Sequence, residues 1–384
     1  MKVLYVLKTN KGAKWALAQA KKLNELGIEI VVVMPNANGE NAKLYNDANM
    51  RVVECDFNLP INKPLSIFSK IKEVQHIIDR EKPDIIHCHF FTNIVMIRLA
   101  LRKNKNIPRV FQVPGPLHLE NIIFRNIDIY SSTENDFWIA TCKKSLKIYK
   151  QNIKSVNKSF LAYYGGYGGE TINQYIKTGK LRREFDIDNN EFLVGMVSYF
   201  YKPKYHLMQL RGLKGHEDFI EAIRILRNKG LKVKGIIIGG PWGNSFNYMK
   251  KLKRIANKKC GDSIIFTGFR NDIKEIYKDI DVVVHPSLSE NLGGAAESLA
   301  AGVSTITTNI GGFPDIVLDG ETGLLVNIKS PKEIANAIEF FINNNEKAIY
   351  MKENGINIIK EKLDIDKTAN DIKNIYEEIL DRRK

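Results

Sequence analysis

The segment from 281 to 312 combines an apolar strand, a glycine-rich loop and the start of a helix. Its loop region carries two carboxylates and two adjacent glycines, namely Glu290, Glu297, Gly293 and Gly294. Free backbone N–H groups and the helix dipole converge at such a loop, so it is suited to bind an anion such as phosphate. A carboxylate one turn into the helix is better placed to accept hydrogen bonds from sugar hydroxyls. Phosphate and sugar together indicate a nucleotide or a nucleotide-sugar.

A lysine precedes another predicted helix in GLKGHEDFIEA, residues 212–222. A cation on that loop would lie at the carboxyl ends of a parallel sheet, where open α/β sheets bind ligands. We expect Lys214 to face the glycine loop and neutralise a diphosphate; the alternative is a solvated loop lysine. A nearby irregular stretch holds further candidates for a second phosphate ligand, and the sequence does not choose among Lys202, Lys204 and Arg211.

The first half offers weaker candidates. Its first strand–helix turn contains Gly12 but no G-x-G-x-x-G, which argues against a nicotinamide enzyme of the usual kind. Gly12 either lets a ligand approach the backbone or is a plain turn glycine. His118, in a Pro/Gly-rich loop after a strand, either donates to a substrate hydroxyl or is structural. His87 and His89 point the same way from a strand, but packed histidines are favoured over a metal site because no ligand cluster accompanies them.

Several signatures of other chemistries are absent from the sequence. It contains no Ser-His-Asp signature, no Walker loop and no zinc spacing. The only D-x-D match, Asp186 to Asp188, falls in a predicted linker and not after a strand. We therefore expect no cofactor and a metal-independent reaction.

Strands alternate with amphipathic helices along both halves, as parallel βαβ units require. The first half contains VLYVL, WALAQAKKLNEL, IEIVVVMP, DIIHCHF, IVMIRLALRK, RVFQVPG, WIATC and KKSLKIYKQ. The second half contains FLVGMVSYF, HEDFIEAIRILRNKG, KVKGIIIGG, MKKLKRIANKKCG, SIIFTGF, NDIKEIYKDI and DVVVHPS. The weakly patterned residues 163–190 mark the junction, and DKTANDIKNIYEEILDRR predicts a final helix.

Length and composition set the broad class. The chain has 384 residues, 44% of them hydrophobic, enough for two domains with full cores. No apolar run reaches the roughly 18 residues of a membrane span, and the N-terminal apolar run is too short for a signal peptide. Four widely separated cysteines without a CxxC motif favour a cytoplasmic protein with reduced thiols.

The net charge of +15 is unevenly distributed. Residues 1–186 hold 29 Lys and Arg against 17 Asp and Glu, whereas residues 187–384 hold 29 against 26. A basic half attracts nucleic acid, anionic lipid or a phosphorylated substrate. A general richness in lysine explains the charge equally well.

In this order, the motifs resemble those of the retaining glycosyltransferases of family 4 (glycosyltransferase group 1), whose GT-B fold contains two Rossmann-like domains. The matching pieces are KGHEDFIEA, TGF at 267–269, DVVVHPSLSE, ESLAAG, TNIGGFPDIV and DGETGLLV at 319–326. GIEIVVVMP, KPDIIHCHFF and WIATCKKSLKIYK match more loosely. The resemblance covers most of the chain and is strongest from 212 to 326.

The resemblance implies roles for the glycine-loop residues. Glu297 matches the glutamate that holds the nucleotide ribose. Glu290 matches the one that holds the donor sugar with neighbouring loop amides, but its spacing is E-x6-E where the family has E-x7-E. Asn291 or the amides of 292–295, with Gly293, Gly294 and Ala295 among them, are therefore alternatives for this role.

Further donor-binding residues follow from the same resemblance. Lys214 matches the family's phosphate-binding lysine, and the TGF piece supplies Gly268 and Phe269. The family's arginine after the strand glycine is missing from VSYFY, so Arg211 or Lys204 is expected to replace it. The first-domain glycine and the acceptor-side histidine match Gly12 and His118.

The resemblance also implies an architecture and an activity. We expect two doubly wound domains facing a central cleft, residues 1–170 on the acceptor side and 190–360 on the nucleotide-sugar side. The C-terminal helix, about 364–384, is expected to pack back on the first. The expected reaction moves a hexosyl group from a nucleoside diphosphate sugar, UDP-sugar foremost, to an acceptor hydroxyl with retention, in cell-surface glycan or polysaccharide biosynthesis.

Expectations about partners are less specific. A glycan or lipid-linked acceptor is expected on the first domain, with peripheral contact to an anionic membrane through the basic half. One alternative is a GT-B nucleotide-sugar epimerase. The other is a nucleic-acid-binding protein, which rests on the pI of about 9.4 alone and leaves the glycine loops unexplained. We therefore expect no nucleic-acid partner.

Overall fold

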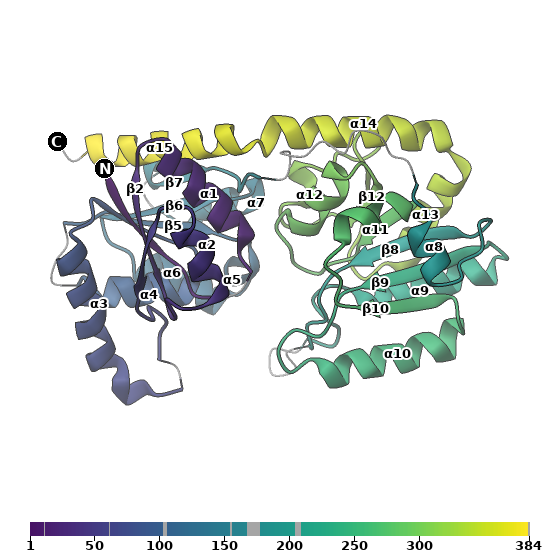
Figure 1. The fold of residues 1–384 in the computed structure, drawn as a ribbon, viewed down its shortest axis with the longest axis horizontal. Helices are drawn as coiled ribbons and strands as arrows, with labels where there is room; N and C mark the ends of the chain where they lie inside the picture. Colours follow the sequence, from purple (N-terminus) through teal and green to yellow (C-terminus); the bar gives the residue numbers. More distant parts are fainter. Residues whose placement is uncertain are drawn as a thin grey trace. The chain divides into compact units, whose positions relative to one another are not determined.

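The computed structural model describes residues 1–10, 12–60, 62–102, 106–153, 156–166, 177–203 and 209–382 (Figure 1). The chain divides into two compact units. The first comprises Met1–Gly169 with Lys362–Lys384, and the second comprises Glu170–Glu361.

The first unit is built on a seven-stranded parallel sheet with the order β3-β2-β1-β4-β5-β6-β7. Its strands are β1 (Lys2–Val6), β2 (Glu29–Met34), β3 (Arg51–Glu54), β4 (Ile85–Cys88), β5 (Arg109–Val113), β6 (Asp136–Ala140) and β7 (Ser159–Leu161). Its helices are α1 (Lys14–Glu25), α2 (Glu40–Asn46), α3 (Ile67–Glu81), α4 (Phe91–Ala100), α5 (Leu117–Glu120), α6 (Ile122–Tyr130), α7 (Lys143–Asn152) and α15 (Ile365–Asp381).

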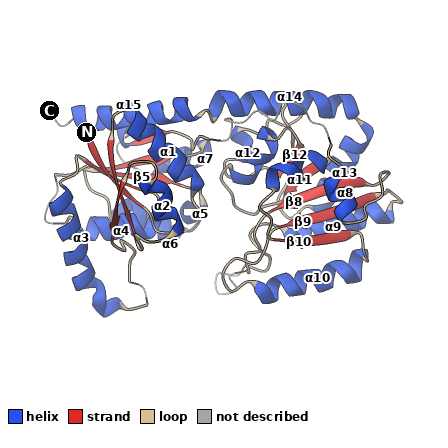
Figure 2. Ribbon diagram, in the orientation of Figure 1, coloured by secondary structure: helices blue, strands red, loops and turns tan. Residues whose placement is uncertain are grey.

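Helices cover both faces of this sheet (Figure 2). Successive side chains of a strand point to opposite faces, so Leu4 of β1 belongs to one core and Tyr5 to the other. Burial on both faces explains why the strands read as continuous apolar runs. Helix α15 packs beside α1, and its residue Tyr376 lies in the same core as Tyr5.

The second unit repeats the design with a six-stranded parallel sheet, β10-β9-β8-β11-β12-β13. Its strands are β8 (Phe192–Val197), β9 (Val233–Ile238), β10 (Ile264–Gly268), β11 (Val282–His285), β12 (Ser304–Thr308) and β13 (Leu324–Val326). Its helices are α8 (Lys180–Glu184), α9 (His216–Asn228), α10 (Phe246–Cys260), α11 (Ile273–Asp279), α12 (Gly293–Ala300), α13 (Pro331–Asn343) and α14 (Asn345–Lys362).

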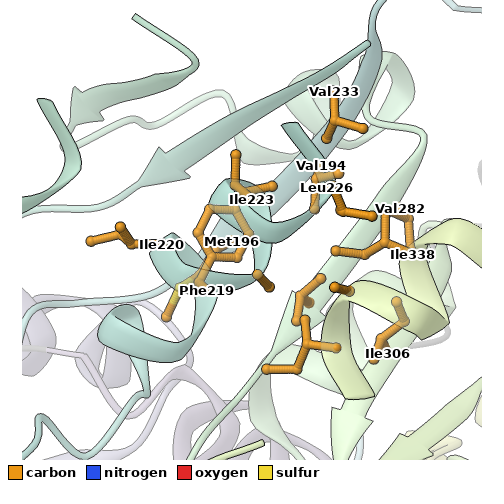
Figure 3. Close-up of a cluster of buried hydrophobic side chains, with 14 of the residues drawn as sticks. Val194, Met196, Phe219, Ile220, Ile223, Leu226, Val233, Val282, Ile306 and Ile338 are labelled. Carbon is orange, nitrogen blue, oxygen red and sulfur yellow. The ribbon is translucent and has the colours of Figure 1, made fainter. Parts of the chain in front are cut away.

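One core of the second unit lies between the sheet and helices α9 and α13 (Figure 3). Phe219, Ile223 and Leu226 from one stripe of α9 meet strand residues such as Val194. Their spacing of three to four residues is the period of an amphipathic helix. The sequence pattern HEDFIEAIRILRN therefore determines which face of α9 is buried.

The predicted fold class, two parallel-sheet α/β domains, is confirmed. Within the predicted junction 163–190, the structure describes helix α8, and residues 167–176 lie outside the described part. Among the helices that the structure describes, none combines the length and the apolar character needed to cross a bilayer.

Candidate active site

The order of the strands marks one place in each sheet where a ligand is expected to bind. In both sheets the sequence order reverses at the central strands, at β1 and β4 in the first and at β8 and β11 in the second. Loops that leave neighbouring strands in opposite directions create a crevice at their carboxyl ends. In the second unit, the loop before α9 contains Lys214, and the loop after β11 contains Glu290.

The backbone joins these two loops tightly. The N–H of Leu288 donates to the carbonyl of Leu213 at 2.8 Å. Gly215 has φ +73°, and a Cβ there would lie 1.9 Å from the carbonyl oxygen of Pro286. Because only glycine fits this position, the lysine loop can lie directly against the loop after β11.

The side chains of Lys214 and Glu290 form an ion pair, and each is 20% exposed. The second carboxylate oxygen of Glu290 accepts a hydrogen bond from the N–H of Asn291 at 3.2 Å. The Lys214 ammonium also lies 5.8 Å from the ring centre of Tyr201. Burial, followed by the Glu290 charge, raises the pKa of Tyr201 to about 12. Lys214 and Glu290, both predicted from the sequence, are therefore in direct contact.

Helix α12 begins at Gly293, close to this pair. The residue before it, Leu292, provides no side-chain cap. The first N–H groups of a helix have no acceptor within the helix, so the backbone of Gly293, Gly294 and Ala295 offers donors together with the positive end of the helix dipole. Gly293 lies near the Glu290 carboxylate, since a Cβ on it would be 3.9 Å from Oε1.

A buried neutral histidine packs against the glycine loop. A Cβ at Gly294 would lie 2.7 Å from Cε1 of His285, so the loop approaches the ring closely because residue 294 has no side chain. His285 Nε2 lies 3.1 Å from the hydroxyl of Ser298 on α12. Burial, followed by the charge of Lys214, lowers the pKa of His285 to about 3. His285 is therefore a neutral ring at physiological pH that packs against the glycine loop. The sequence did not single it out, because a histidine at the end of a strand is common.

The other residues predicted to bind the donor differ from Lys214 and Glu290 in their surroundings. Glu297 is exposed on α12, and its charge is the second cause, after burial, that raises the pKa of Tyr277 on α11. Arg211 forms an ion pair with the buried Asp218 in the first turn of α9. The Lys202 side chain is exposed. Lys204 lies outside the described residues.

An aromatic cluster follows the ends of β8, β9 and β10, and the sequence-based predictions included only one of its members, Phe269. The ring centre of Tyr199 lies 5.1 Å from that of Trp242 and 5.9 Å from that of Phe269. Gly268 has φ +76°, and a Cβ at Gly240 would lie 2.2 Å from the Phe269 ring. The alternation of Tyr199 and Tyr201 after a buried strand was the available signal for a shared aromatic surface.

In the first unit, Gly12 and His118 lie in different settings. Gly12 has φ +73° with open space where a Cβ would be. His118 Nε2 lies 3.3 Å from the Asp128 carboxylate and 3.3 Å from the Tyr149 hydroxyl. Burial alone would raise the pKa of Asp128. The hydrogen bond with His118 and the charge of Arg98 lower it by more, so the pKa of Asp128 lies below its usual value. His118 is thus oriented by a buried carboxylate.

His87 and His89 are both buried and contact tyrosines. His87 Nδ1 is hydrogen-bonded to Tyr376, and His89 Nδ1 lies 2.9 Å from the Tyr164 hydroxyl. Burial lowers the pKa of His87 to about 3 and that of His89 well below its usual value. Among the described residues, no group of three or more His, Cys, Asp or Glu could hold a metal ion.

The D-x-D match lies on the wrong side of the sheet for a metal-assisted diphosphate site. Asp186 and Asp188 precede β8 and therefore lie at its amino end. Lys214 and Glu290 lie on loops at the carboxyl ends. Metal independence remains a prediction, but these two aspartates do not belong to the site around Lys214.

Family models match both units. Residues 180–358 match the model described as Glycosyl transferases group 1, and residues 12–153 match Glycosyltransferase Family 4. The chain therefore belongs to the group 1 glycosyltransferases and is a glycosyltransferase enzyme.

Relatives and solved structures extend over nearly the whole chain. The capsular polysaccharide biosynthesis glycosyltransferase CapM of Staphylococcus aureus is 24% identical over 99% of this chain and 97% of its own. The putative glycosyltransferase EpsD of Bacillus subtilis is 24% identical over 83% and 81%. The crystal structure of Anabaena Alr3699/HepE in complex with UDP has a TM-score of 0.80 at 20% identity, covering 98% of this chain and 100% of that one. At this identity the structural match shows the GT-B fold alone.

Proposed function

We propose that the enzyme transfers a hexosyl group from a UDP-sugar to an acceptor hydroxyl, with retention of the anomeric configuration. The observation that carries this proposal is the Lys214–Glu290 ion pair beside the start of α12. It combines a cation and helix N–H groups for a diphosphate with a carboxylate for sugar hydroxyls. The UDP and UDP-glucose complexes of HepE, which has the same fold, support uridine as the base.

The proposed reaction needs stabilisation of the departing diphosphate. The bond from the anomeric carbon to the diphosphate oxygen breaks, and the acceptor oxygen bonds to that carbon on the same face. The acceptor proton passes to the departing phosphate. Lys214 and the N–H groups of α12 are assigned to the growing negative charge. Glu290 is assigned to the donor sugar and Glu297 to the ribose, and no protein nucleophile is required.

The relatives support a role in polysaccharide biosynthesis, because CapM is named for capsular polysaccharide. We assign the acceptor, a glycan or lipid-linked glycan, to the first unit near His118. The His118 ring, oriented by Asp128, is suited to hydrogen-bond with an acceptor hydroxyl. The proposal places the enzyme in the cytoplasm, in peripheral contact with a membrane, and without a metal cofactor.

Thermal-shift screening against UDP-, GDP- and ADP-sugars tests the donor assignment. A shift with a UDP-sugar alone supports it, and a shift with GDP- or ADP-sugars alone overturns the uridine assignment. NMR of the product then reads the anomeric configuration, which must match that of the donor. Free UDP with an epimerised sugar would identify an epimerase instead. Turnover that persists in a chelator supports metal independence, whereas turnover lost on chelation and restored by a divalent cation contradicts it.

A further inference from the structure

Helix α6 of the first unit exposes its apolar side chains to solvent. We name the α5–α6 apolar face after its exposed members: Leu117, Ile122, Ile123, Phe124, Ile127 and Tyr130. Ile123 and Tyr130 are 64% and 83% exposed. Ile123, Ile127 and Tyr130 are spaced at i, i+4 and i+7, so they share one side of the helix.

A charged anchor fixes this outward orientation. Asp128 is the buried residue of α6, all nine residues of which are described. Its carboxylate accepts hydrogen bonds from Trp138 Nε1 at 3.1 Å and Tyr149 Oη at 2.8 Å, and it forms an ion pair with Arg98. Rotating α6 to bury its isoleucines would break this network and strand a buried charge. The buried contacts of Asp128 therefore keep the apolar side chains of α6 exposed to solvent.

Helix α7, which packs near α5 and α6, carries exposed lysines. Helix α7 exposes Lys143, Lys144, Lys147 and Lys150. The hydrogen bond between Tyr149 and Asp128 ties α7 to α6, and Lys144 lies 3.4 Å from Glu120 of α5. The exposed apolar residues and the cationic residues thus belong to one continuous part of the first unit.

We propose that the α5–α6 apolar face inserts into the interface of an anionic lipid bilayer while the α7 lysines bind its headgroups. Apolar side chains beside lysines are the combination that binds peripheral helices to anionic membranes. A second copy of the chain is disfavoured, because a symmetric contact through this face would bring the lysines of both copies together. The proposal deepens the peripheral membrane contact proposed above, on which it rests, and it does not depend on the identity of the donor.

Vesicle flotation of the full chain tests the proposal. The wild-type protein is expected to float with phosphatidylglycerol-containing vesicles and not with pure phosphatidylcholine. Ile123→Gln/Ile127→Gln should lower binding at least about tenfold, because less apolar area enters the interface. Lys143→Gln/Lys147→Gln should lower it roughly 30-fold, from about 1 kcal/mol for each lysine.

Matched controls come from the second unit. Ile349→Gln/Tyr350→Gln removes two exposed apolar side chains of α14, and Lys251→Gln/Lys258→Gln removes two exposed charges of α10. Both controls should bind vesicles within about twofold of wild type. All variants should keep the thermal shift with the donor, which separates failure of membrane docking from failure of the proposed function.

A fluorescent label locates the contact. Tyr130→Cys and Tyr350→Cys, each in a Cys260→Ser background, carry an environment-sensitive dye. Only the dye at position 130 should shift to shorter wavelength on anionic vesicles. The proposal is overturned by equal shifts at both positions, by equal flotation on neutral vesicles, or by isoleucine variants that bind like wild type. A concentration-dependent dimer that the same isoleucine variant abolishes would assign the face to a second copy, and that also overturns it.

Discussion

The two units share one topology but differ in chemistry at the carboxyl ends of their central strands. In the second unit, the Lys214–Glu290 pair is 20% exposed and lies beside the start of α12. In the first unit, His87 and His89 are fully buried against tyrosines. The same strand order thus provides two candidate binding edges, and at the second edge the accessible Lys214–Glu290 pair suits a diphosphate and its sugar. Topology selects where a ligand can bind, and side-chain charge selects which ligand.

The largest expected effect is on kcat/KM, and it distinguishes Lys214 from a lysine at the amino ends of the strands of the same sheet. Lys214→Ala should lower kcat/KM roughly 10²–10³-fold, because the departing diphosphate loses a preorganised cation. Lys232→Gln, at the amino end of β9, should leave it within about twofold. Steady-state transfer from a UDP-sugar measures both. Near-wild-type turnover by Lys214→Ala would remove Lys214 from the proposed site.

The glycines of the two edges provide a second comparison. Gly215→Ala should lower the free energy of unfolding by roughly 2–5 kcal/mol, because a left-handed backbone and a clash with Pro286 add together. Gly12→Ala, also left-handed but facing open space, should cost about 1–2 kcal/mol. Urea unfolding followed by tryptophan fluorescence measures both, with Trp242 in the second unit and Trp15 and Trp138 in the first. Equal losses would contradict the close approach of the two loops.

Acid should destabilise both units, because each buries histidines in the neutral form. Burial lowers the pKa of His87, His216 and His285 to about 3, whereas unfolded histidines titrate near 6.5. The unfolded state therefore binds more protons, and stability present above about pH 6.5 is lost as the pH falls toward 3. Each histidine should contribute a slope of up to about 1.4 kcal/mol per pH unit.

Urea unfolding at pH 7, 6 and 5 measures this slope. His285→Asn should reduce the slope of the second unit and leave that of the first unchanged. A free energy of unfolding that does not vary between pH 7 and 5 would show that these histidines are not buried as neutral rings.

The smallest expected effect concerns the aromatic cluster of the second unit. Phe269→Ala should raise the KM for the UDP-sugar about fivefold, through loss of roughly 1 kcal/mol of stacking, while kcat stays within about twofold. Phe246→Ala on α10, also an exposed phenylalanine, should change neither constant. Steady-state kinetics at varied UDP-sugar concentration measure KM and kcat for both variants. An unchanged KM would place the base away from Phe269.

Much of the fold was predictable, because strands buried on both faces are continuous apolar runs and α9 has a clear helical period. The meeting of Lys214 with Glu290 was also predictable in outline. Both lie on loops after strands of one parallel sheet, and such loops share an edge. Their direct ion pairing was not predicted, because it depends on the register between two loops that are 76 residues apart in sequence.

Other features depended on contacts between distant segments. Arg98 reads as the polar position of an apolar helix, but it is buried with Asp128 and Asp136. Arg211 was proposed as a phosphate ligand, and the structure pairs it with Asp218. No local pattern distinguishes a buried ion pair from a solvated charge, since the desolvation that decides it comes from tertiary packing.

The central claim, that Lys214 recognises the donor diphosphate in the second unit, is tested most directly by calorimetric titration with UDP and with uridine. The wild-type enzyme should bind UDP at least about tenfold more tightly than uridine, because a charge-assisted contact to phosphate contributes about 1.5 kcal/mol or more. Lys214→Ala should lose most of that preference while its affinity for uridine stays unchanged. If Lys214→Ala keeps the full preference for UDP, the diphosphate binds elsewhere and the assignment of the site is wrong.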